Sequence, residues 1–203
     1  HTLIKTVTEN TEVYDLTKGV RAIQSFVIDD LSNWYVRRSR RRYWNLELNE
    51  DKQQAYITLY QVLIAVSKLT APFAPFLSDE IFTNLTGKES IHLERFPEVN
   101  ESVIFQDLEE EMQTVIDLVS LGRAARNTCS IKVRQTLQAL YVPEKHHHLI
   151  LRMEGLIKEE INVKEIKYIS EKDNFVQYDI KVNFKTMGPK YGKHVKNISQ
   201  AVS

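Results

Sequence analysis

The sequence predicts a mainly α protein, with an antiparallel helix bundle over residues 1–105 and a small α+β domain over residues 106–203. Three observations support this prediction. Apolar residues recur at steps of three and four through the first hundred positions, which is typical of amphipathic helices. Short links separate these segments, as they do between antiparallel neighbours in a bundle. Beyond residue 136 short runs alternate between polar and apolar residues, as strands do.

The first two helices follow from spacing and capping residues. Residues up to about Asn10 are expected to end one helix, and Asp15 or Thr17 is the candidate N-cap of the next. We expect one long helix over residues 20–48, because no proline or glycine interrupts them. Its core stripe consists of Val20, Ile23, Val27, Leu31 and Trp34.

Residues 49–97 are expected to complete the bundle. Asn49 and Asp51 are candidate caps of a third helix, with Tyr56 and Tyr60 among the residues of its apolar face. Pro72 and Pro75 break this helix, and Phe73 and Phe76 are expected to fill the corner by core packing. A short fourth helix is predicted from Ser78 to Gly87, and an extended linker over residues 90–97.

The second domain is predicted to begin with a helix from about Asp107 to Asn127. Strands are expected over residues 137–142 and 163–170, with an amphipathic helix over residues 148–161 between them. Residues 178–184 alternate as well, before a turn at Gly188-Pro189. Lysines accumulate after Ile180, where no acidic residue occurs.

Composition excludes several classes of protein. The 203 residues carry no net charge, with hydrophobic and charged shares of 42% and 27%, as in an ordinary globular chain. One cysteine excludes an internal disulfide framework and a multi-cysteine zinc site. No apolar run reaches the roughly 18 residues of a membrane span, and no secretory signal is recognised. We therefore expect a cytoplasmic protein that does not enter membranes.

The strongest functional signal is the run DDLSNWYVRRSRRRYW at residues 29–44. Two aromatic pairs flank five arginines, Arg37, Arg38, Arg40, Arg41 and Arg42. Guanidinium forks match phosphate oxygens, and indole faces stack on unpaired bases. On an α-helix one stripe would hold Asp30, Trp34, Arg37, Arg41 and Trp44.

The alternative interpretation is a solvated helix face that the acids Glu47, Glu50 and Asp51 neutralise. Five arginines in six positions cover more than one face, however, and repel one another. We therefore favour nucleic-acid binding over the solvated face.

Signatures of other chemistry are weak. The glycines of GPKYGK at residues 188–193 are too close together for a phosphate-binding Walker loop. Adjacent histidines such as His146 to His148 do not converge on one metal ion, so a solvated helix start is expected. Cys129 is interpreted as a buried small hydrophobe. We predict no catalytic residue and no metal site.

Four stretches carry a resemblance to a known family. The arginine run resembles the signature helix of the anticodon-binding domain in class I aminoacyl-tRNA synthetases of the isoleucine, valine, leucine and methionine group, and LTAPFAPFLSDEIF is similar to its next hallmark. The isoleucine branch is the one that GRAARNTCSIKVRQTLQAL and FKTMGPKYGKHVK resemble. Two positions depart from the family pattern: Thr136 stands where proline is usual, and Tyr191 where an aliphatic residue is usual.

The resemblance implies a C-terminal fragment that binds isoleucine tRNA and adjoins the catalytic domain of the same polypeptide. The full enzyme would use ATP and magnesium, whereas this fragment would hold no cofactor and be catalytically inactive, since the family's catalytic signatures and editing domain do not occur in it. The implied tRNA-binding residues are Trp34, Arg37, Arg38, Arg41, Arg42, Trp44, Lys132, Arg134, Lys190 and Lys193.

Two other classes were weighed. In the first, the chain is a structural module whose arginines pair with acids on the catalytic domain. In the second, it is a helix-turn-helix DNA binder, which is disfavoured because the arginine helix lacks the short turn and following recognition helix.

Overall fold

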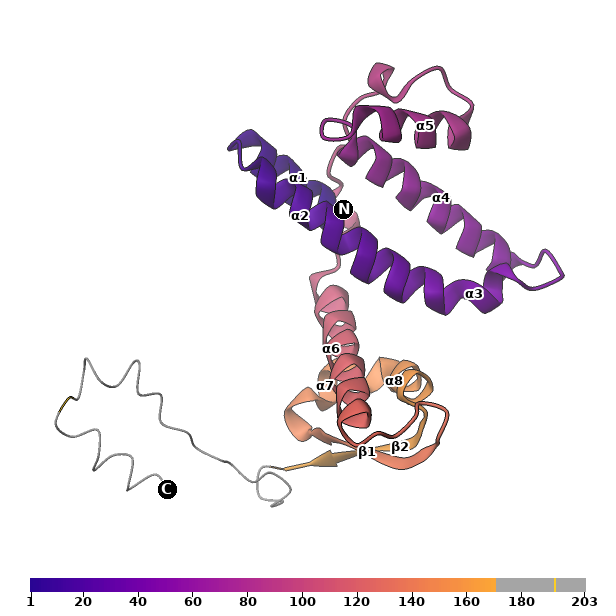
Figure 1. Cartoon of the computed structure of the whole chain (residues 1–203), viewed down its shortest axis with the longest axis vertical. Coiled ribbons are helices and arrows are strands. Elements are labelled where there is room, and N and C mark those ends of the chain that lie inside the picture. The colour runs from indigo at the N-terminus through magenta and orange to yellow at the C-terminus, as the bar shows by residue number, and fades with distance from the viewer. Residues whose placement is uncertain (171–191, 193–203) are drawn as a thin grey trace. The chain divides into compact units, whose positions relative to one another are not determined.

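The structure is a computed structural model that describes residues 1–170 and residue 192. These residues are mainly helical, with one two-stranded parallel sheet. The chain divides into two compact units, His1–Phe105 and the unit that begins at Gln106 (Figure 1). Within the described residues, no helix is both long enough and apolar enough to cross a membrane. The predicted strand at 178–184 and the turn at Gly188-Pro189 lie outside the described residues.

The first unit begins with a helical hairpin of α1 (Thr2–Glu12) and α2 (Leu16–Ser25), which lie side by side in Figure 1. The Asp15 carboxylate accepts a hydrogen bond from the Lys18 amide at 3.2 Å, which confirms Asp15 as the N-cap. Helical backbone then continues without interruption through η1 (Phe26–Val36) and α3 (Arg37–Tyr43). The long helix predicted from the spacing is therefore present.

Two details of that prediction are wrong. The helix ends at Tyr43 rather than Leu48, and its middle stretch η1 is π-helical. Asn45 and Asn49 explain the early end, because asparagine favours turns and caps over helix interiors. The Asn49 side chain accepts from the Lys52 amide at 2.9 Å and so starts α4 (Glu50–Thr70) as predicted. The π-helical pairing from residue i to i+5 shifts the faces of η1, so the single stripe drawn for an α-helix does not hold.

The core of the first unit joins α1, α2 and α4. Its buried members are Ile4, Val7, Ile23 and Leu69, and Val27, Val66 and Phe73 pack against them. Phe73 therefore fills the corner after α4, as predicted.

Three other aromatic predictions in this unit are wrong. Phe76 is 90% exposed, because α5 (Pro75–Thr86) begins at Pro75 and places Phe76 in its first turn instead of the corner. Proline is favourable at this first position, where its missing N–H costs no helical hydrogen bond. Tyr56 and Tyr60 on α4 are 48% and 43% exposed rather than buried in the core. Gly87 closes α5 at a φ of 69°, as predicted for a left-handed C-cap.

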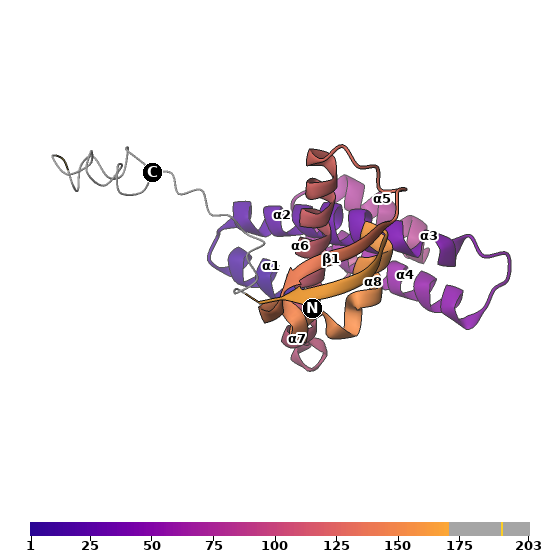
Figure 2. The ribbon, with the colours of Figure 1, turned by 90° about the horizontal axis from the view of Figure 1, so that it is seen from below.

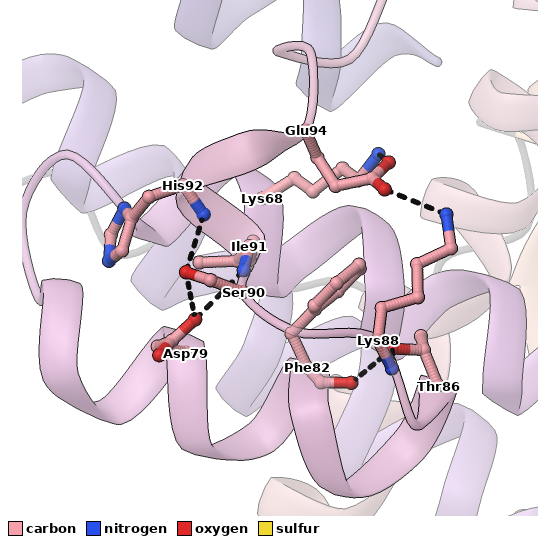
Figure 3. A network of polar contacts seen from close by, with 9 residues as sticks. All are labelled: Lys68, Asp79, Phe82, Thr86, Lys88, Ser90, Ile91, His92 and Glu94. Atoms are coloured by element: carbon pink, nitrogen blue, oxygen red, sulfur yellow. Dashed lines mark hydrogen bonds and ion pairs between the residues drawn. The ribbon is translucent and has the colours of Figure 1, made fainter.

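Residues 90–97 do not form the extended linker that was predicted. They begin with a short 3₁₀ turn, η2 (Ile91–Leu93), and a second such turn follows at η3 (Glu101–Val103). The Asp79 carboxylate on α5 accepts from the Ser90 hydroxyl and the Ile91 amide, both at 2.8 Å (Figure 3). These two hydrogen bonds fix the turn to α5.

An ion-pair network fixes the end of the same segment. Glu94 accepts from Lys68 of α4 at 2.9 Å and from Lys88 at 2.7 Å (Figure 3). The Lys68 ammonium also lies 5.8 Å from the centre of the Phe82 ring. The pKa of the Glu94 carboxyl falls to about 2, because both lysines bond to its charged form.

The second unit is built on α6 (Gln106–Thr128), β1 (Leu137–Pro143) and β2 (Val163–Ile169). Figure 2 shows the two strands side by side; they pair in parallel from Leu137 opposite Val163 to Pro143 opposite Ile169. Parallel strands need a crossover, which the helical segment between them provides. The fully buried core residues of the second unit are Val115, Val119, Val142, Ile150, Ile157 and Ile161.

The single helix predicted over residues 148–161 is wrong. Four short pieces take its place: η4 (Glu144–His146), α7 (His147–Ile150), η5 (Leu151–Met153) and α8 (Glu154–Ile161). The break at η5 directs Arg152 toward α6, where its Nη2 donates to Glu111 Oε1 at 2.7 Å. A second pair between Arg123 and Glu160 joins α6 to α8.

Packing of α6 on α8 depends on Gly122. A Cβ at this position would lie 2.5 Å from Ile161 Cδ1 and 3.2 Å from its Cγ1. Because Ile161 is buried, the G122V substitution should destabilise the second unit by about 1–3 kcal/mol through overpacking. Chemical denaturation measures this loss. G155A is the control, since a Cβ at Gly155 meets no atom within 4 Å, and equal effects of both variants would contradict close α6–α8 packing.

The Glu94 network predicts a pH-dependent stability. The pKa of Glu94 in the folded protein is about 2, below its ordinary value of 4.5. The ionised carboxylate therefore contributes fully to the free energy of unfolding above pH 4.5, and this contribution is lost as the pH falls toward 2. E94Q should therefore lower the melting temperature at pH 7, and its deficit should shrink at pH 3. Thermal melts at both values measure this, with E89Q on an exposed carboxylate as control. A deficit of the same size at pH 3 would contradict the ionised network.

Candidate nucleic-acid interface

The contact between α3 and α4 determines which side chains of the arginine run point outward. Ser39 is buried, the Tyr35 hydroxyl donates to the Ala55 carbonyl at 3.4 Å, and the Tyr43 ring packs on Tyr56 with centroids 5.1 Å apart. Tyr35, Ser39 and Tyr43 are spaced four apart, so they form one face of the helix. Burial raises the pKa of Tyr43 to about 12, which keeps its phenol neutral. The arginines occupy the remaining surface.

The five arginines lie in different surroundings. Arg40 and Arg41 are exposed, whereas Arg37, Arg38 and Arg42 are partly buried. Arg37 Nε donates to the Asn33 carbonyl one turn earlier, at 2.7 Å. The segment therefore presents both engaged and outward guanidinium groups.

Arg42 has an acidic partner within the same unit. Its Nε lies 2.9 Å from Asp51 Oδ2 and its Nη2 lies 2.9 Å from Oδ1, while Nη2 also donates to the Asp51 carbonyl at 3.1 Å. The hydrogen bond to Asp51 raises the pKa of Arg42. For this one arginine the solvated-face interpretation fits best, because its charge is already balanced by one of the acids that the interpretation named.

The two tryptophans also differ. The Arg38 guanidinium carbon lies 5.4 Å from the Trp34 ring centre, a cation–π arrangement that covers one face of a partly buried indole. Trp44 follows the last residue of α3 and is 76% exposed. Leu46 and Leu48 in the same loop are exposed as well. Of the two indoles, Trp44 offers the larger open ring surface.

Arg40 is an exposed arginine that the sequence prediction passed over. It was counted in the run but left out of the predicted tRNA-binding set. Its guanidinium is exposed and makes no ion pair or hydrogen bond with any of residues 1–170. The signal that would have found it is the face formed by Tyr35, Ser39 and Tyr43, since Arg40 lies just off that face.

The other predicted basic residues belong to the second unit or to the undescribed part of the chain. Lys132 and Arg134 are exposed in the loop that joins α6 to β1. Lys190 and Lys193 lie outside the described residues. The structure thus brings the arginines and tryptophans of residues 34–44 together and describes Lys132 and Arg134 as a separate pair.

Among the described residues, the other reactive side chains do not form a second candidate site. The prediction that Cys129 is buried is wrong, since this thiol is exposed just beyond the end of α6. The His147 ring packs on Tyr168 with centroids 4.3 Å apart. Over residues 1–170, no group of three His, Cys, Asp or Glu side chains is placed to hold a metal ion. Guanidinium forks and an open indole are groups for binding an anion and an aromatic base.

The first unit and the start of the second match a known protein family. A family model described as "Anticodon-binding domain of tRNA ligase" matches residues 1–141, which run from α1 through α6 into β1. The matched range contains the whole arginine run and also the loop that carries Lys132 and Arg134.

Curated relatives extend the similarity over the whole chain. An isoleucine–tRNA ligase of Clostridium acetobutylicum is 43% identical over 209 residues, with 100% of this chain and 20% of the relative covered. One of Cytophaga hutchinsonii is 44% identical, with 99% of the chain and 19% of the relative covered. One of Porphyromonas gingivalis is 42% identical, with 100% of the chain and 18% of the relative covered. The chain thus spans about a fifth of the length of these relatives.

Proposed function

Because the chain belongs to the family of anticodon-binding domains of tRNA ligases, we propose that it is the part of an isoleucine–tRNA ligase that grips the anticodon arm of isoleucine tRNA. The helices of the first unit then form the antiparallel bundle of class I synthetases over residues 1–105, and the unit that begins at Gln106 is the appended α+β domain. The partner tRNA is inferred from the names of the relatives, which are isoleucine–tRNA ligases.

One observation carries this proposal: the helix from Leu16 to Tyr43 ends in a run of arginines whose packed face is supplied by uncharged residues. Arg40 and Arg41 are exposed, and Arg37 and Arg38 lie beside them. Like charges at helical spacing cost a few tenths of a kcal/mol per pair, and phosphate groups of RNA would relieve that repulsion. Arg42 takes a smaller part, because Asp51 already engages its fork.

Trp44 is proposed to stack on an unpaired base. It lies next to the arginine run, its indole is 76% exposed, and its loop holds the ring outside the helix. Trp34 is proposed to brace Arg38 through the cation–π contact rather than to bind a base. Unpaired bases with a nearby phosphate backbone are found in an anticodon loop, which fits an indole beside guanidinium groups.

The chemistry of the ligase would lie elsewhere in the polypeptide. There the enzyme would attach isoleucine to its tRNA with ATP and magnesium, in the cytoplasm. This chain would hold the tRNA substrate and would be inactive alone, with no cofactor of its own.

A second role is favoured by an exposed apolar surface. At the start of α5, Phe76 is 90% exposed and Leu77 is 61% exposed. Contiguous exposed apolar patches mark sites of protein contact, and these two side chains expose apolar surface in the first turn of α5. We propose that they pack on the catalytic domain of the same polypeptide; the docking role considered from sequence used the arginines instead.

The arginine assignment predicts a loss of tRNA binding with a changed salt dependence. Replacing Arg37, Arg38, Arg40 and Arg41 by alanine should weaken binding of isoleucine tRNA about tenfold or more. The slope of log K against log salt should fall by about two to three, since each lost phosphate contact removes close to one counterion. Titrations at two salt concentrations measure both.

The matched control is R21A, which removes an exposed arginine roughly 20 Å up the same helix. It should leave affinity and slope nearly unchanged. Unaltered tRNA binding by the fourfold variant at fixed salt would show that the arginine run is not the site.

The Trp44 assignment separates stacking from simple packing. W44A should weaken tRNA binding by roughly five- to 150-fold, because stacking on one base contributes about 1–3 kcal/mol. W44F keeps an aromatic face and should retain most of the affinity. Since Trp44 is exposed, neither variant should alter the melting temperature, and a W44A protein that binds like wild type would rule out a stacked base.

A further inference from the structure

The loop between α6 and β1 is held by its carbonyl groups. Four consecutive carbonyl oxygens, those of residues 132–135, accept hydrogen bonds from only two side chains. Arg126 Nη1 donates to the first and last of them, at 3.1 and 2.9 Å. Asn162 Nδ2 donates to the two in between, at 2.9 and 3.2 Å. We call this arrangement the carbonyl clamp.

The two donors of the carbonyl clamp are themselves fixed in place. Arg126 lies in the last turn of α6 and is only 3% exposed, and its Nη2 donates to the Asn162 carbonyl at 3.0 Å. That carbonyl also accepts from the Leu137 amide at 3.1 Å, where β1 begins. Asn162 itself has a φ of 57°, a left-handed conformation that asparagine tolerates better than most residues. The clamp therefore joins α6, β1 and the turn between α8 and β2.

With the four carbonyls directed at the clamp, the side chains of residues 132–135 are all exposed. Two of them are the cations Lys132 and Arg134. No acidic residue occurs over residues 118–143, and the other two cations of that stretch are engaged: Arg123 pairs with Glu160, and Arg126 is buried. Lys132 and Arg134 are thus the outward positive charges of an acid-free stretch.

We propose that the carbonyl clamp preorganises residues 132–135 as a second phosphate-binding element for RNA, with Lys132 and Arg134 as ligands and Arg126 and Asn162 as positioning residues. This inference rests on the proposed function, because the tRNA is the source of the phosphates. The family match extends to residue 141 and so includes the loop, which favours RNA over an acidic protein surface.

A loop that is already held in one shape loses less conformational entropy when it binds phosphate. A free loop of this length loses conformational entropy when it binds, and each long side chain that becomes fixed adds about 0.5–1.5 kcal/mol. A loop whose backbone is already held loses only the side-chain part of that entropy. The two cations are separated by one residue and both face solvent, so they can reach successive phosphates of one strand.

Thr136 adds a further restraint at the same place. Its hydroxyl donates to Asn162 Oδ1 at 3.2 Å, a bond that the proline usual at this position in the resembling family cannot make. In this chain a hydrogen bond to the positioning residue replaces the stiffness of a proline ring.

The clamp is tested on the full-length protein by N162G. Glycine keeps the left-handed backbone conformation but removes every side-chain bond of the clamp that Asn162 makes. Trypsin cuts after Lys132 and Arg134 only when this loop opens, so peptides ending at these residues should appear at least several-fold faster in N162G. T136V, which removes only the hydroxyl bond at the surface, is the milder variant and should give a smaller increase.

Binding is tested by K132A and R134A in titrations with isoleucine tRNA. Each should weaken binding about three- to tenfold and lower the salt slope by about one. K145A is the matched control, an exposed lysine at the other end of β1, roughly 20 Å away along the strand, and it should change neither value. N162G should lose affinity like K132A while keeping its salt slope, because its cations remain.

The outcomes separate this inference from the proposed function. If K132A and R134A bind tRNA like K145A while the fourfold arginine variant of the first unit is impaired, the loop inference is wrong and the proposed function stands. If neither set matters, the proposed function fails. Unchanged cleavage of both N162G and T136V would show that the clamp does not hold the loop.

Discussion

The packing of α3 on α4 is the constraint on which the arginine surface depends. Tyr35 near the end of η1 and Ser39 and Tyr43 of α3 form an uncharged face, which packs against Ala55 and Tyr56 of α4. As the last seven residues of a longer helix, α3 is rich in like charges that repel one another, so without a packed face it would fray. Tertiary contact through this face keeps the arginines helical, and so determines which of them point away from the unit.

The packing of α3 on α4 also determines which arginine is neutralised by an acidic residue. The chain carries no net charge, so the arginine run is a local field rather than a general basic character. Asp51, at the start of α4, is brought opposite Arg42 and neutralises it, whereas Arg40 at the other side of the helix keeps its charge exposed. Attraction for an anion is therefore directional. Such a patch raises the rate of encounter with a polyanion at low salt, and its attraction weakens as salt screens it.

Much of the fold could be predicted because local rules acted alone there. Asp15, Asn49 and Gly87 cap helices as their chemistry requires, and both described strands lie where alternation placed them. Predictions failed where tertiary context decides. Side-chain spacing does not reveal the π-helical hydrogen bonds of η1, and Phe76 has an apolar side chain that no described neighbour covers. Arg40 was missed because five adjacent arginines look alike until the buried face of α3 is known.

The arginine run and the loop of residues 132–135 both present positive charges to solvent, but they are held in place by different contacts. In the first unit a helix presents arginines whose side chains are partly engaged, by Asp51 or by the Trp34 ring, so binding must exchange some existing contacts. In the second, the backbone rather than the side chains is restrained, since Arg126 and Asn162 hold carbonyl groups and leave Lys132 and Arg134 outward. A buried guanidinium with only carbonyl partners is costly to desolvate, although its place in the last turn of α6, at the negative end of the helix dipole, offsets part of that cost. Arginine suits this place because one guanidinium fork has several donors and so holds the carbonyls of residues 132, 135 and 162 at once.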